Sequence, residues 1–348
     1  MIAPVVALRP PLDQHALAAM GWAGLGVADI FAQLEPINHL IEPLDLCPGA
    51  PALVAGYGYS GKTVAIQSAA VSIAAGFPVW GMFPARRGRV LHVDYEQGPR
   101  LTRERYQRLA AGMRLSPDDL AGNLELVSMP SVYLDAHQAE DFFTERCEGV
   151  DLVIVDSLRV AAPSLDENDS DIRSVFDRLN RVSHRTGCCS IIIHHARKPS
   201  MTAAGGAKAT IRGSGAIFDA SGSVLIFDAV KGKPIRVSHE KARSSGITVP
   251  DFSLTIADVV TEHGPKGGLA VTAQALGAAP SSAPDGLRDR IRQYLLEHGD
   301  ERPSKTALCK ILAVKRDPFF AAMAEMEATG EVINAGTKQK PVLKLARL

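Results

Sequence analysis

The segment from Gly56 to Thr63, GYGYSGKT, matches the pattern G-x-x-x-x-G-K-[ST] of a phosphate-binding loop. It follows the apolar run 52–55 and opens a helical pattern, which is the context that this motif requires. Backbone N–H groups of such a loop surround the β-phosphate, the lysine reaches the β- and γ-phosphates, and the hydroxyl binds Mg²⁺. We therefore predict a site for ATP and Mg²⁺. Its phosphate-binding residues would be Gly56, Tyr57, Gly58, Tyr59, Ser60, Gly61, Lys62 and Thr63.

Acidic residues follow two other apolar runs. Asp156 ends the run 152–155, and we expect it to hold Mg²⁺ together with Thr63. Glu96 follows the run 90–93 and is well placed to orient and deprotonate an attacking water. Asp94, two residues earlier, remains the competing candidate for this base.

The elements that must position these residues are short apolar strands. Residues 46–262 alternate such runs with helical stretches, which is typical of an α/β fold with a mainly parallel sheet and helices on both faces. Ligands of such folds lie at the carboxyl edge of the strands, where the loop and both acids are expected. The predicted strands include 52–55, 90–93, 152–155, 190–193, 224–227 and 235–237, with 254–256 at an edge.

The order of these motifs resembles the RecA-like P-loop ATPase core. After the loop and Glu96 come DSLR at 156–159 and IIIHH at 191–195, followed by RGSG at 212–215. The pattern is similar to the hexameric plasmid-replication helicases of the RepA type, with the DnaB and KaiC groups more distant, and it covers residues 46–262. It implies that Glu96 is the catalytic base and that His194 senses the γ-phosphate, with His195 as the alternative.

The resemblance also implies a homo-hexameric ring whose active sites are completed by cations of the neighbouring subunit. Two candidates stay open for this role. Arg212 precedes Gly-Ser as in the plasmid helicases, and Lys241 with Arg243 resembles the Lys-x-Arg pair of DnaB-type proteins.

A polar loop is expected after the double histidine. Residues 196–211 are rich in Gly and Ala and carry Lys198 and Lys208. In the family this loop faces the ring channel and contacts single-stranded DNA, since a flexible backbone with cations can follow phosphates without sequence preference. The alternative is an ordinary mobile surface loop.

The length of 348 residues favours more than one domain. We predict an N-terminal arm (1–45) with a short helix near 27–34, the ATPase core (46–262), a linker rich in Gly, Ala, Ser and Pro (263–286), and a C-terminal winged helix (287–348). The last segment has twelve Lys and Arg against eight Asp and Glu. It would bind duplex DNA or, alternatively, a protein. Its candidate DNA contacts are Lys315, Arg316, Lys338 and Lys340.

Composition excludes several other classes of protein. Lys and Arg number 38, as do Asp and Glu, so any DNA-binding surface must be a local patch. The five cysteines form no C-x-x-C pair and no Cys/His cluster with zinc spacing, which is typical of reduced thiols in a cytoplasmic protein. No signal peptide is apparent, and the uncharged stretch 64–85 is broken by Gly and Pro, which favours a buried helix and a turn over a membrane span.

These observations predict an ATP-hydrolysing ring ATPase that acts on DNA. The 45-residue arm, in place of the N-terminal helical domain of DnaB, favours a replicative-helicase-like motor of a plasmid, phage or mobile element. The main alternative is a non-motor switch that assembles with ATP and binds DNA or a protein through the winged helix. A small-molecule kinase is disfavoured by the basic loop, and a GTPase by the absence of an N-K-x-D motif.

Overall fold

The computed structural model describes residues 24–195 and 215–276 and, further along, residues 291, 294–295, 304–312, 314, 316–328, 332–334 and 343–345. Two units are distinguished, residues 1–38 and 39–348. In the first unit, α2 (Val27–Ile30) forms only the first turn of the helix predicted at 27–34. The large apolar residues of the described part of this unit, from residue 24 on, are exposed.

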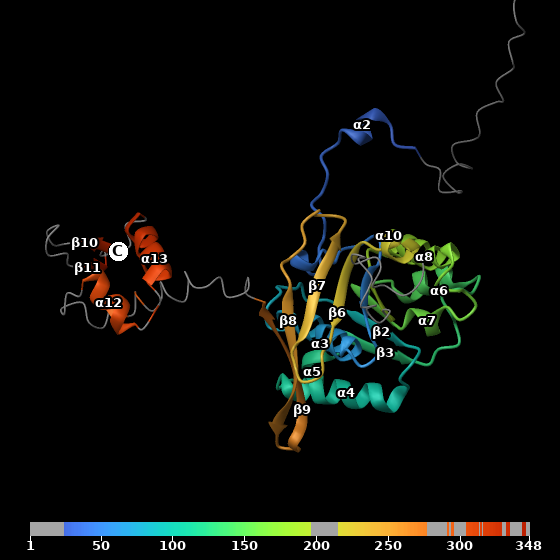
Figure 1. The fold of residues 1–348 in the computed structure, drawn as a ribbon. Coiled ribbons are helices and arrows are strands. Elements are labelled where there is room, and N and C mark those ends of the chain that lie inside the picture. Colours follow the sequence, from blue (N-terminus) through green and yellow to red (C-terminus); the bar gives the residue numbers. More distant parts are fainter. Residues whose placement is uncertain are drawn as a thin grey trace, which may run out of the picture. The chain divides into compact units, whose positions relative to one another are not determined.

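A nine-stranded sheet forms the centre of the second unit, in the order β3-β2-β4-β5-β1-β6-β7-β8-β9 (Figure 1). The first six strands in this order are parallel and the last three are antiparallel. This confirms the predicted RecA-like α/β class. The strands are β1 (Ala52–Gly56), β2 (Val90–Asp94), β3 (Leu124–Ser128), β4 (Leu152–Asp156), β5 (Cys189–His195), β6 (Ser223–Asp228), β7 (Ile235–Ala242), β8 (Phe252–Thr261) and β9 (Gly264–Ala275).

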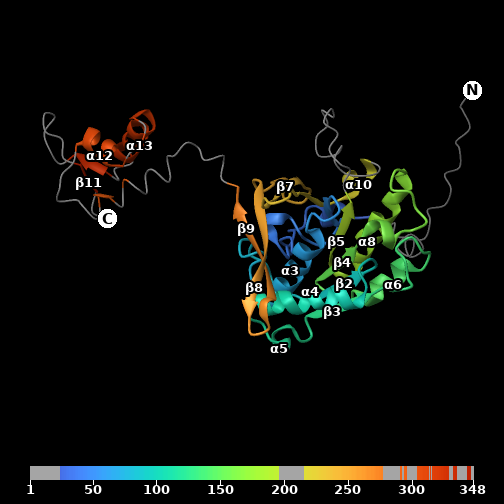
Figure 2. The same ribbon diagram turned by 60° about the horizontal axis from the view of Figure 1, so that its bottom comes forward.

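Helices cover both faces of the parallel part because its strands are apolar on both sides (Figure 2). In β1, Val54 packs on the side of α3, whereas Leu53 and Ala55 pack on the side of α8. The helices are α3 (Lys62–Ala75), α4 (Pro99–Gly112), α5 (Pro117–Leu120), α6 (Ala139–Arg146), α7 (Leu158–Ala161), α8 (Arg173–Thr186) and α10 (Gly215–Ala220), with 3-10 turns η1 (Glu42–Leu44) and η2 (Ser170–Ile172).

The uncharged stretch 64–85 is a buried helix followed by a turn, as predicted. Helix α3 ends at Ala75, where Gly76 adopts a left-handed conformation with φ 82°. Within the described residues, no helix is both long and apolar enough to cross a membrane.

The prediction of a linker from residue 263 is wrong for its first half. Residues 264–275 form β9, which pairs with β8 along its length and is the true edge strand. The glycines there allow close packing. A Cβ at Gly268 would lie only 3.0 Å from the Cα of Gly112, at the end of α4. Small residues that suggested a free linker therefore allow the hairpin to pack against α4 (Figure 1).

The boundary of the N-terminal arm also differs from the prediction at residue 45. Leu40, Ile41, Leu44 and Leu46 are buried in the core cluster on the α3 side, so the core begins at about residue 39. Strand β3 was not predicted, because its alternating sequence LELVS is only half-buried at the other edge of the sheet.

The described C-terminal residues form a small apolar cluster around α12 (Lys305–Ile311), α13 (Arg316–Ala328) and the antiparallel pair β10 (Val332–Asn334) and β11 (Leu343–Leu345). Ser304 caps α12 by accepting a hydrogen bond from the Ala307 N–H at 3.2 Å. Ile311, at the end of α12, is exposed. The winged helix itself stays a prediction.

Candidate nucleotide-binding site

The phosphate loop joins β1 to the first turn of α3. Two of its glycines are required by the surrounding structure. At Gly61 φ is 81°, and a Cβ would lie 2.8 Å or less from the Ile235 and Ile256 side chains. At Gly56 a Cβ would meet the Phe227 carbonyl oxygen at 2.7 Å. The loop thus holds a tight curve at the N-terminus of α3, where backbone N–H groups and the helix dipole favour a phosphate.

Lys62 is buried and folded back onto this loop. Its Nζ donates to the carbonyl oxygens of Gly56 (2.8 Å) and Tyr57 (2.6 Å), and to the Ser60 hydroxyl at 3.2 Å. Burial lowers the pKa of Lys62 to about 8, although the carboxylates of Asp156 and Glu96 partly oppose this shift. The ammonium is therefore held at the loop and poorly solvated, a setting that favours exchange of these carbonyls for phosphate oxygens.

The loop exposes one aromatic side chain at its tip. Tyr59 is fully exposed and has a left-handed backbone with φ 63°, which is unusual for a residue with a Cβ. The Tyr57 hydroxyl, by contrast, is buried with no hydrogen-bond partner among the described residues.

Asp156 offers a buried oxygen that suits a divalent cation. It ends β4, and its Oδ2 is buried without a hydrogen-bond partner in the described part of the chain. Burial raises its pKa to about 6, and a hydrogen bond from Thr63 partly offsets the effect. A carboxylate oxygen and a threonine hydroxyl are hard donors of the kind that Mg²⁺ prefers, so the residues present fit that ion.

Asp94 and Glu96 have different roles in the local geometry. The buried carboxylate of Asp94 accepts hydrogen bonds from Thr102 Oγ1 (2.6 Å) and Ser128 Oγ (3.2 Å). It also accepts from the backbone N–H groups of Glu96 (3.0 Å) and Gln97 (2.8 Å). With four donors, Asp94 fixes the turn after β2 and has no lone pair in reach of a substrate water, which argues against it as the base.

Glu96 lies at the mouth of the site and is about one-third exposed. Its Oε2 accepts a hydrogen bond from the Ser157 hydroxyl at 2.7 Å and lies 3.8 Å from His195 Nε2. His195 and Ser157 together keep the pKa of Glu96 below its ordinary value, with a smaller contribution from Lys62. The carboxylate is thus ionised at neutral pH and able to accept a proton.

The two histidines at the end of β5 point to opposite faces of the sheet, as successive strand residues must. His195, in register with Gly56, faces Glu96. His194 is completely buried on the other face, where its Nδ1 lies 3.4 Å from Glu167 Oε1. The geometry therefore corrects the expectation for His194: the histidine at the mouth of the site is His195.

Lys241 and Arg243 hold the C-terminal end of α10. Lys241 Nζ donates to the carbonyls of Phe218 (2.8 Å) and Asp219 (3.0 Å), and Arg243 Nη2 also donates to Asp219. Because Lys241 pairs with Val224 near the start of β6, both cations lie at the amino edge of the sheet. The phosphate loop is at the carboxyl edge of the adjacent parallel strand β1. It begins at Gly56, three residues beyond the Leu53 that pairs with Val224, which is about 10 Å further along the strand at 3.3 Å per residue.

Several predicted residues lie outside the described part of the chain, and their roles stay predictions: Lys198, Lys208, Arg212, Lys315, Lys338 and Lys340. Arg316 is exposed at the first residue of α13, with its guanidinium 5.5 Å from the centroid of the Phe320 ring.

Three further residues at the site were not predicted from the sequence: Ser157, Thr102 and Glu167. Ser157 could have been predicted, because it directly follows Asp156 at the end of β4. From there its hydroxyl reaches Glu96, which follows the neighbouring strand β2. Thr102 and Glu167 carry no local signal, since only the packing of α4 and of the 166–169 loop brings them to their partners.

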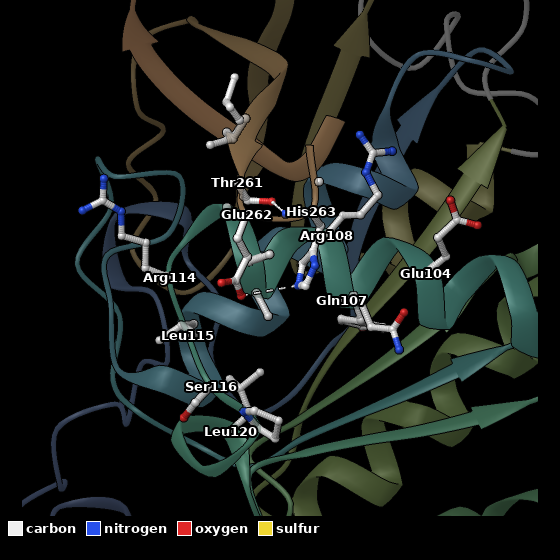
Figure 3. A pocket seen from close by; sticks show the side chains of 18 residues that line it. Glu104, Gln107, Arg108, Arg114, Leu115, Ser116, Leu120, Thr261, Glu262 and His263 are labelled. Atoms are coloured by element: carbon white, nitrogen blue, oxygen red, sulfur yellow. Dashed lines mark hydrogen bonds and ion pairs between the residues drawn. The ribbon is translucent and has the colours of Figure 1, made fainter. Parts of the chain in front are cut away.

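A cavity of about 1070 Å³ lies between α4 and the β8–β9 hairpin, and no residue of the phosphate loop lines it (Figure 3). Arg108 and Arg114 from the α4 segment and Glu262 and His263 from the hairpin line it with mixed charge. Its size therefore does not mark the nucleotide site.

A phosphate loop on the central strand of a RecA-like sheet, with acids at the carboxyl ends of β2 and β4 on the same sheet edge, defines a P-loop ATPase. Residues 18–201, more than half of the chain, match the model of the AAA domain family. The chain belongs to this family.

Proposed function

We propose that this protein hydrolyses ATP and couples hydrolysis to movement along, or remodelling of, DNA as a ring-shaped, replicative-helicase-like motor. The observation that supports coupling between DNA binding and hydrolysis is the contact of His195 with Glu96. His195 ends β5, and the basic segment 196–211 begins with the next residue. A displacement of that segment by bound DNA would reach the predicted catalytic carboxylate through a single side chain.

In the proposed reaction, Lys62 leaves the loop carbonyls and binds the β- and γ-phosphate oxygens. Thr63 and Asp156 would hold Mg²⁺, which neutralises phosphate charge when bound. Glu96 orients the attacking water and accepts its proton. Ser157 and His195 act as positioning residues that fix the direction of the Glu96 carboxylate.

Sites shared between subunits agree with the placement of Lys241 and Arg243. At the opposite edge of the sheet, they are too far from the phosphate loop of their own chain to contact its γ-phosphate. In a homo-hexameric ring this edge would face a neighbour's site, and one of the two cations would stabilise charge on the transferring phosphoryl group. Arg212 remains the alternative.

DNA would be bound in two ways. The segment 196–211 would follow single-stranded phosphates with Lys198 and Lys208. The C-terminal segment would bind duplex DNA through α13 and the following hairpin, with the exposed Arg316 at the start of the helix. The resemblance to plasmid-replication helicases supports a plasmid, phage or mobile-element context.

The proposal is tested by neutralising the loop. We expect Lys198→Ala with Lys208→Ala to weaken single-strand binding. The slope of log affinity against log salt concentration should become less steep by about two contacts, since each phosphate contact contributes roughly 0.7 to that slope. The control is Lys231→Ala with Lys233→Ala, two exposed lysines in the turn between β6 and β7. Unchanged affinity and salt slope in the 198/208 variant would remove the loop from the DNA contact.

A further inference from the structure

Three side chains with different metal-binding atoms meet at the amino edge of the sheet, away from the phosphate loop. They are His39, Asp45 and Cys47, of which Asp45 and Cys47 are buried. Their ligand atoms all lie within 4.8 Å of one another. A tight hairpin presents them: Ile41 and Leu46 form a bridge around the 3-10 turn η1, so His39 and Cys47 are on opposite arms.

The spacing within this cluster fits metal ligands as well as it fits an ion pair. His39 Nε2 lies 3.4 Å from Asp45 Oδ1, which is longer than an ordinary hydrogen bond. Two ligands at 2.0–2.1 Å from a tetrahedral zinc ion are separated by about 3.3 Å. The imidazole and the carboxylate are thus already at ligand spacing.

Surrounding groups hold the cluster in place. Asp45 accepts hydrogen bonds from the backbone N–H groups of Ser244 (2.8 Å) and Ser245 (3.0 Å). The Ser244 hydroxyl also contacts Cys47 Sγ at 3.0 Å. Outer contacts of this kind orient metal ligands. The nearby His239 is excluded as a ligand, because its ring nitrogens are engaged by Ser223 and by a backbone N–H.

Cys47 is buried beside Asp45 and would bind the ion as a thiolate, releasing its proton on binding. His39 keeps 16% of its side chain exposed, which leaves an entry path for the ion.

We propose that His39, Asp45 and Cys47 bind one structural Zn²⁺, with water in the fourth position. Mixed nitrogen, oxygen and sulfur donors select zinc over magnesium. The ion would fasten the 39–47 hairpin to the 244–245 turn that follows Arg243. This site could not be predicted from the sequence, because one of its ligands is an aspartate and its spacing, H-x5-D-x-C, is not that of a zinc finger.

The test is Co²⁺ binding by the metal-stripped full chain, followed by absorption. We expect one Co²⁺ per chain at this cluster with a thiolate-to-cobalt band, which Co²⁺ at the oxygen ligands Thr63 and Asp156 cannot produce. Cys47→Ser and His39→Gln should each abolish the band, because either substitution removes one of only three protein ligands. Matched controls are Cys309→Ser, at another buried free cysteine, and His263→Gln, at an exposed histidine.

Thermal unfolding gives a second readout that does not depend on activity. Zn²⁺ should raise the unfolding midpoint of the wild type and of both controls, and leave that of His39→Gln unchanged. Because His39 lies at the edge of the core, His39→Gln should unfold in EDTA at the same temperature as metal-free wild type. Absence of the thiolate band in wild type, or a band and a Zn²⁺ shift that persist in His39→Gln, would overturn the proposal.

Discussion

Asp94 and Glu96 are two residues apart, yet their surroundings give them different chemistry. Four donors occupy Asp94, whereas Glu96 has one hydroxyl partner, a histidine nearby and access to solvent. The residue types alone left both as candidates for the base. Only the packing of Thr102 and Ser128 against Asp94 separates them, and no pattern in the sequence carries that information.

Replacing the predicted base should uncouple nucleotide binding from hydrolysis. We expect Glu96→Gln to bind ATP with wild-type affinity and to lower kcat by roughly 10²–10⁴-fold, the usual contribution of a general base. Equilibrium binding and steady-state phosphate release measure the two effects. Asp94→Asn is the comparison, and it should lower the unfolding temperature, because the amide cannot accept all four hydrogen bonds. Normal turnover by Glu96→Gln would contradict the assignment.

Ser157 should matter only through Glu96. Removing its hydroxyl frees the carboxylate to rotate, so Ser157→Ala should lower kcat by about tenfold with little change in ATP affinity. In the Glu96→Gln background the same substitution should have no further effect on kcat, because residues that act as a unit are not additive. An equal reduction in both backgrounds would show that Ser157 acts independently.

At the scale of elements, the buried strands were predictable and the outer ones were less so. Five apolar runs became central parallel strands because burial on both faces demands continuous apolar residues. Strand β9 was missed because its Gly and Ala residues resemble a linker, although they serve contact with α4. The opposite directions of His194 and His195 follow from strand periodicity, but which of them faces Glu96 depends on the packing of β5.

The contact between α4 and β9 can be tested at Gly112. A Cβ there would overlap the main-chain carbonyl of Leu269, which cannot move without disturbing the β8–β9 pairing. We expect Gly112→Ala to destabilise the protein by about 1–3 kcal/mol, as overpacking does. Gly215→Ala is the control, since a Cβ at Gly215 meets no atom within 4 Å. Equal unfolding midpoints for both variants would contradict the close approach.

At the scale of the whole molecule, the separation of Arg243 from the phosphate loop predicts sites shared between chains. Arg243→Ala and Glu96→Gln should each be inactive alone. Mixed subunits should regain part of the ATPase activity, because some interfaces would then combine an intact Glu96 with an intact Arg243. A mixture with no activity above the sum of the two variants would count against a finger at Arg243.

The most direct test of the central claim is steady-state ATP hydrolysis by the full chain, titrated separately with single-stranded and duplex DNA. A motor that couples Glu96 to the 196–211 segment predicts strong stimulation by single strands, which should be lost in Lys198→Ala with Lys208→Ala. Stimulation by duplex alone would shift DNA recognition to the C-terminal segment and a regulatory role. A rate indifferent to both would contradict the account and favour a nucleotide switch that acts on a protein partner.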